Sequence, residues 1–216
     1  GRRVLRCAQC IPSWMHAGKA SGRRLQSFGG KPAPSEPMVP EPLPPWIQWV
    51  VHRLVDSGIV PADAPPNHCL VNEYQPGQGI EAHQDGPMYA PYAAILSLGS
   101  HIVLDFVASV DPSERGRLDP PGIEDDNDDC EEVLTSLLLP RRGLLVFAGE
   151  AYERYLHRVP ARMEDDTTQP GLLKLDASIG EETGTVPRSR RVSLTLRRVL
   201  NVQGTLQAAT DVTLVL

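Results

Sequence analysis

The stretch Leu137-Leu138-Leu139-Pro140-Arg141-Arg142-Gly143-Leu144-Leu145-Val146-Phe147 contains two apolar runs separated by turn residues. The intervening segment, from Pro140 to Gly143, has the composition of a tight turn. Short apolar runs bounded by Pro and Gly are typical of buried strands. The stretch therefore predicts two β-strands joined by a tight turn.

The same rhythm of apolar runs and turn residues continues on both sides of this stretch. Strands are predicted over residues 69–74, 93–98, 102–107, 133–139, 144–147 and 191–199. One helix precedes them, because apolar residues recur at helical spacing after Pro44 and Pro45, and Gly58 stands where a helix commonly ends. Its predicted core face consists of Ile47, Val50, Val51, Leu54 and Val55. A helix followed by short, mostly antiparallel strands favours a mainly β fold with flanking helices (α+β), built as a two-sheet jelly roll.

The chain has 216 residues, of which 41% are hydrophobic and 22% charged, and this fits one globular domain rather than a disordered or fibrous protein. Residues 1–30 are predicted to be a lid-like segment, expected to be truncated because the chain starts at Gly1 rather than Met. Residues 31–45 carry seven prolines and are predicted to be an extended connector. The jelly-roll domain is expected over residues 46–200, with insertions near 111–132 and 164–187 and a tail over 201–216.

The formal net charge of -6 is concentrated in one segment. Eight acidic and no basic residues lie between Asp119 and Glu132, and removing these eight charges from -6 leaves +2 for the rest of the chain. A nucleic-acid partner therefore stays open, provided that local arginines meet its phosphates. The candidate cluster is Arg2, Arg3, Arg6, Arg23 and Arg24. A solvated basic face without a partner is the alternative.

Four cysteines do not make the disulfide framework of a secreted protein at this length, so an intracellular protein, nuclear or cytoplasmic, is expected. Cys7 and Cys10 have C-x-x-C spacing, but no second Cys or His pair follows at the distance of a zinc site. No apolar run approaches the roughly 18 to 20 residues that span a bilayer, so no membrane partner is expected. The oligomeric state is left open, with a monomer favoured.

The segment His83-Gln84-Asp85 places an imidazole and a carboxylate on the same side of an extended chain. His157 follows the paired Leu-rich strands. Two histidines and one carboxylate on one face of a metal leave the other face open, as in non-haem iron(II) oxygenases. The alternative is a surface His–Asp pair or a core histidine with satisfied hydrogen bonds.

The predicted last strand, over residues 191–199, carries Arg191 and Arg197 on the same face. Buried guanidinium groups need anions, so one can pair with the distal carboxylate of a dicarboxylic acid while the other reaches toward the metal end of that ligand. Asn72 and Tyr74 supply an amide and a phenol on one face of an earlier strand. An exposed arginine stripe on an edge strand is the alternative.

In this order along the chain, the motifs resemble the AlkB-like iron(II)/2-oxoglutarate dioxygenases, and among them the branch called AlkB homologue 6. The resemblance covers about residues 21–200. It rests on the stretches Ser21–Gly30, Met38–Trp46, Leu70–Gly77, His83–Pro87, Ser97–His101 and Arg191–Arg197.

The resemblance implies a double-stranded β-helix (jelly roll) that holds iron(II) on His83, Asp85 and His157. It implies 2-oxoglutarate and O2 as co-substrates, with 2-oxoglutarate held by Arg191, Arg197, Asn72, Tyr74 and Ser193. This family couples oxidative decarboxylation of 2-oxoglutarate, with release of succinate and CO2, to hydroxylation of a carbon, often an N-methyl group on a nucleic-acid base. Catalysis is then centred on the metal, with no separate catalytic residue.

The expected substrate is an alkylated base in DNA or RNA, single-stranded or flipped out of a duplex. The candidate substrate contacts are the aromatic residues Trp14, Phe28, Tyr89 and Tyr92, with core or lid packing as the alternative. Two positions depart from the family pattern: Pro87 stands where base-repairing relatives commonly carry an acidic residue, and Ser193 where some carry Asn. Two other functions therefore stay open, a hydroxylase or demethylase of protein side chains and a nucleic-acid-binding module with little turnover.

Overall fold

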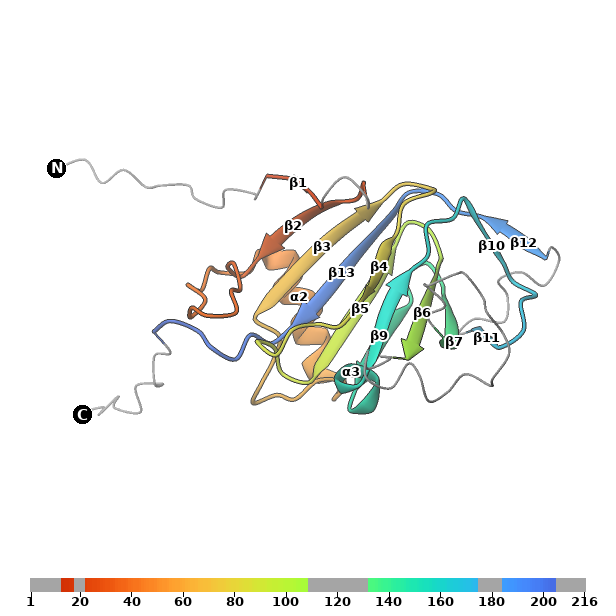
Figure 1. Cartoon of the computed structure of the whole chain (residues 1–216). Helices are drawn as coiled ribbons and strands as arrows, with labels where there is room; N and C mark the ends of the chain where they lie inside the picture. The colour runs from red at the N-terminus through yellow and green to blue at the C-terminus, as the bar shows by residue number, and fades with distance from the viewer. Residues whose placement is uncertain (1–12, 18–21, 109–131, 175–183, 205–216) are drawn as a thin grey trace, which may run out of the picture.

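The computed structural model describes residues 13–17, 22–108, 132–174 and 184–204, which form two facing β-sheets, a separate two-stranded sheet and two helices, the longer helix lying on the outside of the larger sheet (Figure 1). The larger sheet has the strand order β1 (Met15–His16), β2 (Arg24–Phe28), β3 (His68–Tyr74), β13 (Arg191–Arg197), β5 (Tyr92–Leu98) and β8 (Leu144–Ala148). The smaller sheet has the order β11 (Leu172–Lys174), β7 (Val133–Leu139), β6 (Ile102–Ala108), β9 (Tyr155–Val159) and β4 (Ile80–His83). This is the predicted mainly β jelly roll.

The six strands predicted from the sequence are all present, with ends that differ by a residue or two. The two strands around the turn at Pro140 do not pair with each other. β7 pairs with β6 in the smaller sheet, whereas β8 pairs with β5 in the larger one. The turn, closed by a 3.0 Å hydrogen bond from Gly143 N to Pro140 O, therefore carries the chain from one sheet to the other.

Helix α2 (Pro45–Asp56) covers the outer face of the larger sheet. Of its predicted core face, Ile47, Val51 and Leu54 are buried, while Val50 and Val55 are partly buried against the same core. The helix ends as predicted, because Gly58 takes a φ of 68° and its N–H donates to Val55 O. This outer core also contains Cys69 and Val71 of β3 and Leu194 and Leu196 of β13.

A second apolar core lies between the two sheets and holds them together. It includes Ile95 of β5, Leu104 and Phe106 of β6, Phe147 of β8 and Val159 of β9. The short helix α3 (Glu150–Glu153), between β8 and β9, adds the buried ring of Tyr152. Apolar side chains of β5, β6, β8 and β9 therefore fill this part of the space between the two sheets.

The predicted insertions have different outcomes. Most of the span 111–132 lies outside the described residues. In the described part of the span 164–187, β10 (Glu164–Asp166) pairs with β12 (Thr185–Pro187), and β11 runs parallel to β7 at the edge of the smaller sheet. In the described parts of the chain, no helix has the length and apolar character needed to cross a membrane.

Candidate active site

A cavity of about 190 Å³ lies between the two sheets. Strands β3, β5 and β13 line one side, and β4, β6 and β9 line the other. On β13 the side chains of Arg191, Ser193, Thr195 and Arg197 face the cavity, while the alternate residues pack toward α2. This is the two-residue period of a strand, so the arginine spacing in the sequence correctly predicts a shared face.

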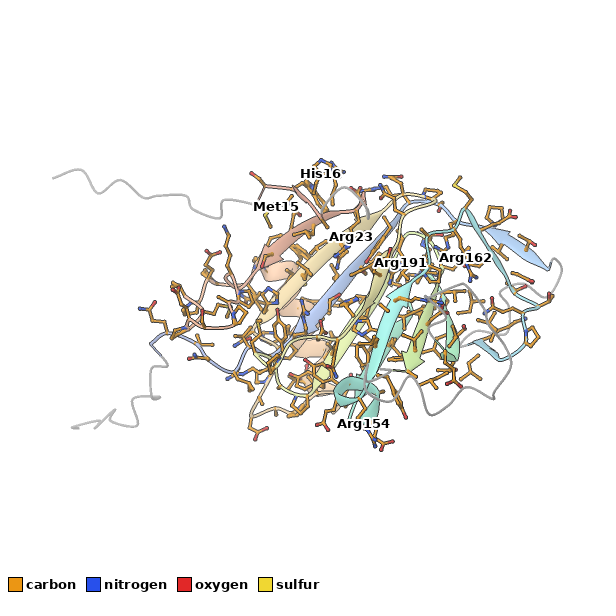
Figure 2. All side chains as sticks on the ribbon, viewed as in Figure 1. Met15, His16, Arg23, Arg154, Arg162 and Arg191 are labelled. Atoms are coloured by element: carbon orange, nitrogen blue, oxygen red, sulfur yellow. The ribbon has the colours of Figure 1, made fainter. Side chains whose placement is uncertain are left out.

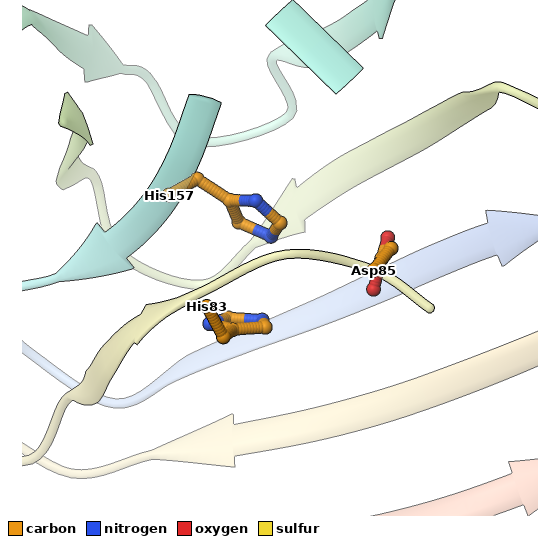
Figure 3. A group of neighbouring side chains, drawn as sticks. All are labelled: His83, Asp85 and His157. Carbon is orange, nitrogen blue, oxygen red and sulfur yellow. The ribbon is translucent and has the colours of Figure 1, made fainter. Parts of the chain in front are cut away.

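His83, Asp85 and His157 converge at one side of this cavity (Figure 3). One potential ligand atom from each lies within 4.8 Å of the others. The antiparallel pairing of β4 with β9 places His83 directly opposite His157, and their ring centroids are 4.3 Å apart. Asp85 follows β4 by two residues, so one short segment brings two of the three groups.

Both histidines are suited to bind a metal because burial favours their neutral form. Burial, together with the nearby His83, lowers the pKa of His157 to about 4, and burial also lowers the pKa of His83. The Nδ1 atom of His83 lies 2.8 Å from Glu81 O, which can only accept, so Nδ1 carries the proton. The Nε2 lone pair of His83 is therefore directed away from this bond and available to a metal.

Neighbouring residues pack against, or hydrogen-bond to, the segments that carry these three side chains. The ring of Phe147 meets that of His157 edge to face at a centroid distance of 5.2 Å. Between the two ligands of the short segment, Gln84 donates from its amide to Tyr152 O and Glu153 O at the end of α3. The intervening residue of the H-x-D motif thus anchors the segment to a neighbouring element.

Arg197 donates to Oδ1 of Asp85, and both side chains are 7% exposed. The guanidinium also lies beneath the ring of Tyr89, with 4.2 Å from Cζ to the ring centroid. Oδ2 of Asp85 is buried and, within the described residues, has no hydrogen-bond partner. An unpartnered buried carboxylate oxygen beside two neutral imidazoles is a donor set that suits a divalent metal ion.

Arg191 marks the other end of the polar lining. It is 2% exposed, donates from Nη2 to Ser97 Oγ at 2.8 Å, and lies 5.5 Å from the centroid of the Tyr74 ring. Burial lowers its pKa to about 10, so it remains a cation at neutral pH. Its Nε is buried and unpartnered among the described residues, which leaves a donor for an incoming carboxylate.

Asn72 and Ser193 are buried, face the same cavity and pair across β3 and β13. The residues that the sequence assigns to 2-oxoglutarate therefore lie together, with Arg197 nearest the potential metal ligands. The buried Nε atoms of Arg191 and Arg197, which have no hydrogen-bond partner among the described residues, suit a dicarboxylic acid that reaches from Arg191 to the His–Asp–His group. The chain's own residues thus fit both iron and 2-oxoglutarate.

The four aromatic candidates do not line the cavity. Phe28 and Tyr92 belong to the core under α2, where Phe28 packs against Trp46 and the Tyr92 hydroxyl donates to Ala64 O. Their alternation along β2 and β5 turns them to the outer face of the larger sheet. Tyr89 stacks on Arg197, and Trp14 stacks on Arg24 at 4.9 Å.

Sequence reasoning missed three residues of the site, namely Arg23, Gln84 and Ser97. Arg23 belongs to the predicted basic cluster, but it lines the cavity and donates from Nε to Asn72 Oδ1 at 3.2 Å. Arg23 lies two residues before Leu25, so the two side chains point to the same side of the sheet. That this side faces the cavity follows only from the pairing of β2 with β3, which sets Leu25 opposite Asn72. Arg2, Arg3, Arg6, Cys7 and Cys10 lie outside the described residues.

A family model described as "2OG-Fe(II) oxygenase superfamily" matches residues 13–197. The chain belongs to this superfamily. Its members use Fe(II), 2-oxoglutarate and O2, and the chain is accordingly a 2-oxoglutarate-dependent dioxygenase.

Similar proteins place this oxygenase among the AlkB-like enzymes, as the sequence motifs predicted. It is 37% identical over 188 residues to "Probable RNA/DNA demethylase ALKBH6" of Danio rerio, covering 87% of this chain and 74% of the relative. It is 28% identical over 187 residues to "tRNA (carboxymethyluridine(34)-5-O)-methyltransferase ALKBH8" of Mus musculus, covering 82% of this chain and 24% of that protein. The solved structure of OsALKBH1 aligns with a TM-score of 0.48 at 19% identity, covering 87% and 83% of the two chains.

Proposed function

We propose that this oxygenase hydroxylates or removes an alkyl group on a nucleic-acid base, releasing succinate and CO2. The substrate class is supported by the relative from Danio rerio, whose name describes a probable RNA/DNA demethylase. The observation that carries the proposal is the convergence of His83, Asp85 and His157 beside a cavity whose far polar end holds the buried cation of Arg191.

In this proposal His83, Asp85 and His157 hold iron(II), and 2-oxoglutarate is bound by Arg191, Arg197, Asn72, Tyr74 and Ser193. When bound, iron(II) with 2-oxoglutarate and O2 supplies the oxidising equivalents for hydroxylating a carbon on the substrate. A hydroxylated N-methyl group is then lost as formaldehyde.

The chain's own residues bind, orient and exclude water. Arg191 receives the distal carboxylate, with Ser97 holding its guanidinium in place. Arg197 orients Asp85, and the ring of Tyr89 orients Arg197. The apolar side chains of Ile80, Leu104 and Val159 limit the access of water to the ligand cluster.

Anaerobic addition of iron(II) and 2-oxoglutarate tests the site. The wild type is expected to show the visible charge-transfer band of an iron–keto-acid chelate, and His83→Ala to lack it. Gln75→Ala, in the exposed turn after β3, is the matched control and should keep the band. Absence of the band in the wild type, or its survival in His83→Ala, contradicts the proposed metal site.

Succinate release under oxygen tests the substrate. N-methylated oligonucleotides are compared with the same sequences without the methyl group and with methylated peptides. Faster succinate release with the methylated oligonucleotide, accompanied by formaldehyde, is the expected result. A response to peptides alone would instead assign a protein side chain as substrate and overturn the nucleic-acid proposal.

A further inference from the structure

A buried carboxylate on the outer face of β3 holds two exposed arginines side by side. Glu73 is 2% exposed, and Arg24 of β2 donates from Nε to its Oε2 at 2.6 Å. Arg190, just before β13, donates from Nε to its Oε1 at 2.5 Å. The arginine side chains are 42% and 61% exposed. Two cations are thereby kept close together at the surface, although they would repel each other without the carboxylate.

This cluster of Arg24, Glu73 and Arg190 keeps a net positive charge and spare donors. Arg24 approaches Glu73 through Nε and Nη2, and Arg190 through Nε. A guanidinium carries five N–H groups, so each arginine retains donors beyond those used in its ion pair. Because Glu73 already orders both side chains, an anion that binds them loses less side-chain entropy than it would on free arginines.

An exposed aromatic ring adjoins the cluster. The ring of Trp14 covers the Arg24 guanidinium and is 36% exposed. Pairing of β1 with β2 sets His16 opposite Arg24 and continues this outer surface to the sheet edge. Proteins commonly bind single-stranded nucleic acids with such a combination, in which the cations contact phosphates and a base stacks on the aromatic ring.

Both arginines of the cluster are sequence neighbours of residues that line the cavity. Arg24 follows Arg23, and Arg190 precedes Arg191, and both of these neighbours line the cavity. Successive residues of a strand point to opposite faces, so the cluster and the cavity share one end of the larger sheet on its two sides. Figure 2 shows Arg23 and Arg191 at this end and Arg154 at the opposite end, beside α3.

We propose that Arg24, Arg190 and Trp14 bind a stretch of single-stranded nucleic acid several nucleotides away from the target base, because the proposed metal ligands lie at the Arg197 end of the cavity. The phosphates contact the Glu73-bridged arginines, and one base of this stretch stacks on Trp14. This inference rests on the proposed function, which it deepens by assigning the outer surface at the edge of the larger sheet as the path of the nucleic-acid strand.

The test measures binding of a labelled single-stranded oligonucleotide without modified bases, by fluorescence anisotropy over a series of salt concentrations. Arg24→Gln and Arg190→Gln should each weaken binding and reduce the slope of log affinity against log salt by about 0.7. The corresponding Lys variants keep the charge and should keep the slope. Arg154→Gln, which removes an exposed arginine paired with Glu150, is the control and should leave both quantities unchanged.

Trp14→Ala should weaken binding by about 5- to 150-fold with an unchanged salt slope, and Trp14→Phe should restore most of the affinity. Each variant is also tested for the iron–2-oxoglutarate band, so a folding defect is recognised by its loss. If a Gln or Ala variant loses the band, the Lys and Phe variants at the same positions test whether the charge and the ring bind the oligonucleotide.

Equal salt slopes for the wild type and both Gln variants would overturn the inference. So would stronger binding of an acidic peptide than of the oligonucleotide, which would assign the surface to a protein partner. If methylated oligonucleotides still stimulate succinate release in those cases, the proposed function stands without this surface. If they do not, the proposed function fails as well, and the two failures are thus distinguished.

Discussion

Arg197 donates to the carboxylate of Asp85, a residue 112 positions earlier in the chain. The pair joins the two halves of the site, because Asp85 belongs to the proposed metal-ligand group and Arg197 to the strand that carries Arg191. One guanidinium therefore contacts a proposed metal ligand while lining the cavity in which we propose that the co-substrate binds. Groups that orient a ligand in this way are commonly worth 10- to 100-fold in metal affinity, which is an order-of-magnitude guide.

Replacing Arg197 with Met should therefore weaken iron(II) binding by about 10- to 100-fold, because Asp85 loses its hydrogen-bond donor and its orientation. Anaerobic iron titration measures this affinity. Arg198→Met is the matched control, since the next side chain along donates to Pro65 O instead. Equal iron affinities for the wild type and Arg197→Met would contradict the orienting role.

Replacing Arg191 with Gln should raise the KM for 2-oxoglutarate by about 10-fold or more, because a hydrogen bond to a charged group contributes roughly 1.5–3 kcal/mol. Iron affinity without 2-oxoglutarate should stay nearly unchanged, since Arg191 lies at the other end of the cavity lining. Ser97→Ala should raise the same KM by a smaller factor. A parallel loss of iron and 2-oxoglutarate binding would indicate misfolding instead.

Removing one partner of the buried Asp165–Arg188 pair should strongly destabilise the protein near the start of β13. Arg188 donates to both carboxylate oxygens of the fully buried Asp165, at 2.7 Å from Nε and 2.5 Å from Nη2. Burial by itself raises the pKa of Asp165, but the hydrogen bonds from Arg188 and the nearby His101, whose Nε2 lies 3.3 Å from Asp165 Oδ2, outweigh it, and the net shift is downward.

Asp165→Asn should lower the free energy of unfolding by about 3–5 kcal/mol, because it leaves the Arg188 cation buried and unpaired. Urea denaturation measures the change. Asp166→Asn, at the exposed neighbouring position, should cost less than about 1 kcal/mol. Similar losses at the two positions would refute the importance of the buried pair.

His68 should make the protein less stable in mild acid. Burial, with the nearby Arg197, lowers its pKa from 6.5 to about 3, and its Nδ1 has no partner among the described residues. Between pH 6.5 and 3 the His68 side chain is therefore protonated in the unfolded chain but not in the folded protein. The free energy of unfolding falls as the pH drops through this range.

From about pH 7 to about pH 5, this single group should lower the free energy of unfolding by about 2 kcal/mol. His68→Gln keeps a hydrogen-bonding side chain near Ser27, which lies 2.9 Å from His68 Nε2, but does not titrate. Urea denaturation at the two pH values should show a correspondingly smaller acid loss for the variant. An unchanged difference would show that another group governs this pH range.

The sequence by itself determined which residues share a face of each strand. The two-residue period of β13 sets Arg191, Ser193 and Arg197 on one side, and the spacing of His83 and Asp85 places them together. The helical period after Pro45 likewise identified the buried residues of α2. These features are local, because the backbone geometry of one element is enough to produce them.

Only the tertiary structure decided which sheet each strand joins and which face of it meets the cavity. Local periodicity does not distinguish the two faces of a sheet when both are buried, as in the larger sheet between α2 and the smaller sheet. For this reason Phe28 and Tyr92 lie under α2 rather than in the site, Arg23 lies inside the cavity, and β7 and β8 belong to opposite sheets. These placements depend on hydrogen bonding between strands that are distant in the sequence, such as the β4–β9 pairing that sets His83 opposite His157.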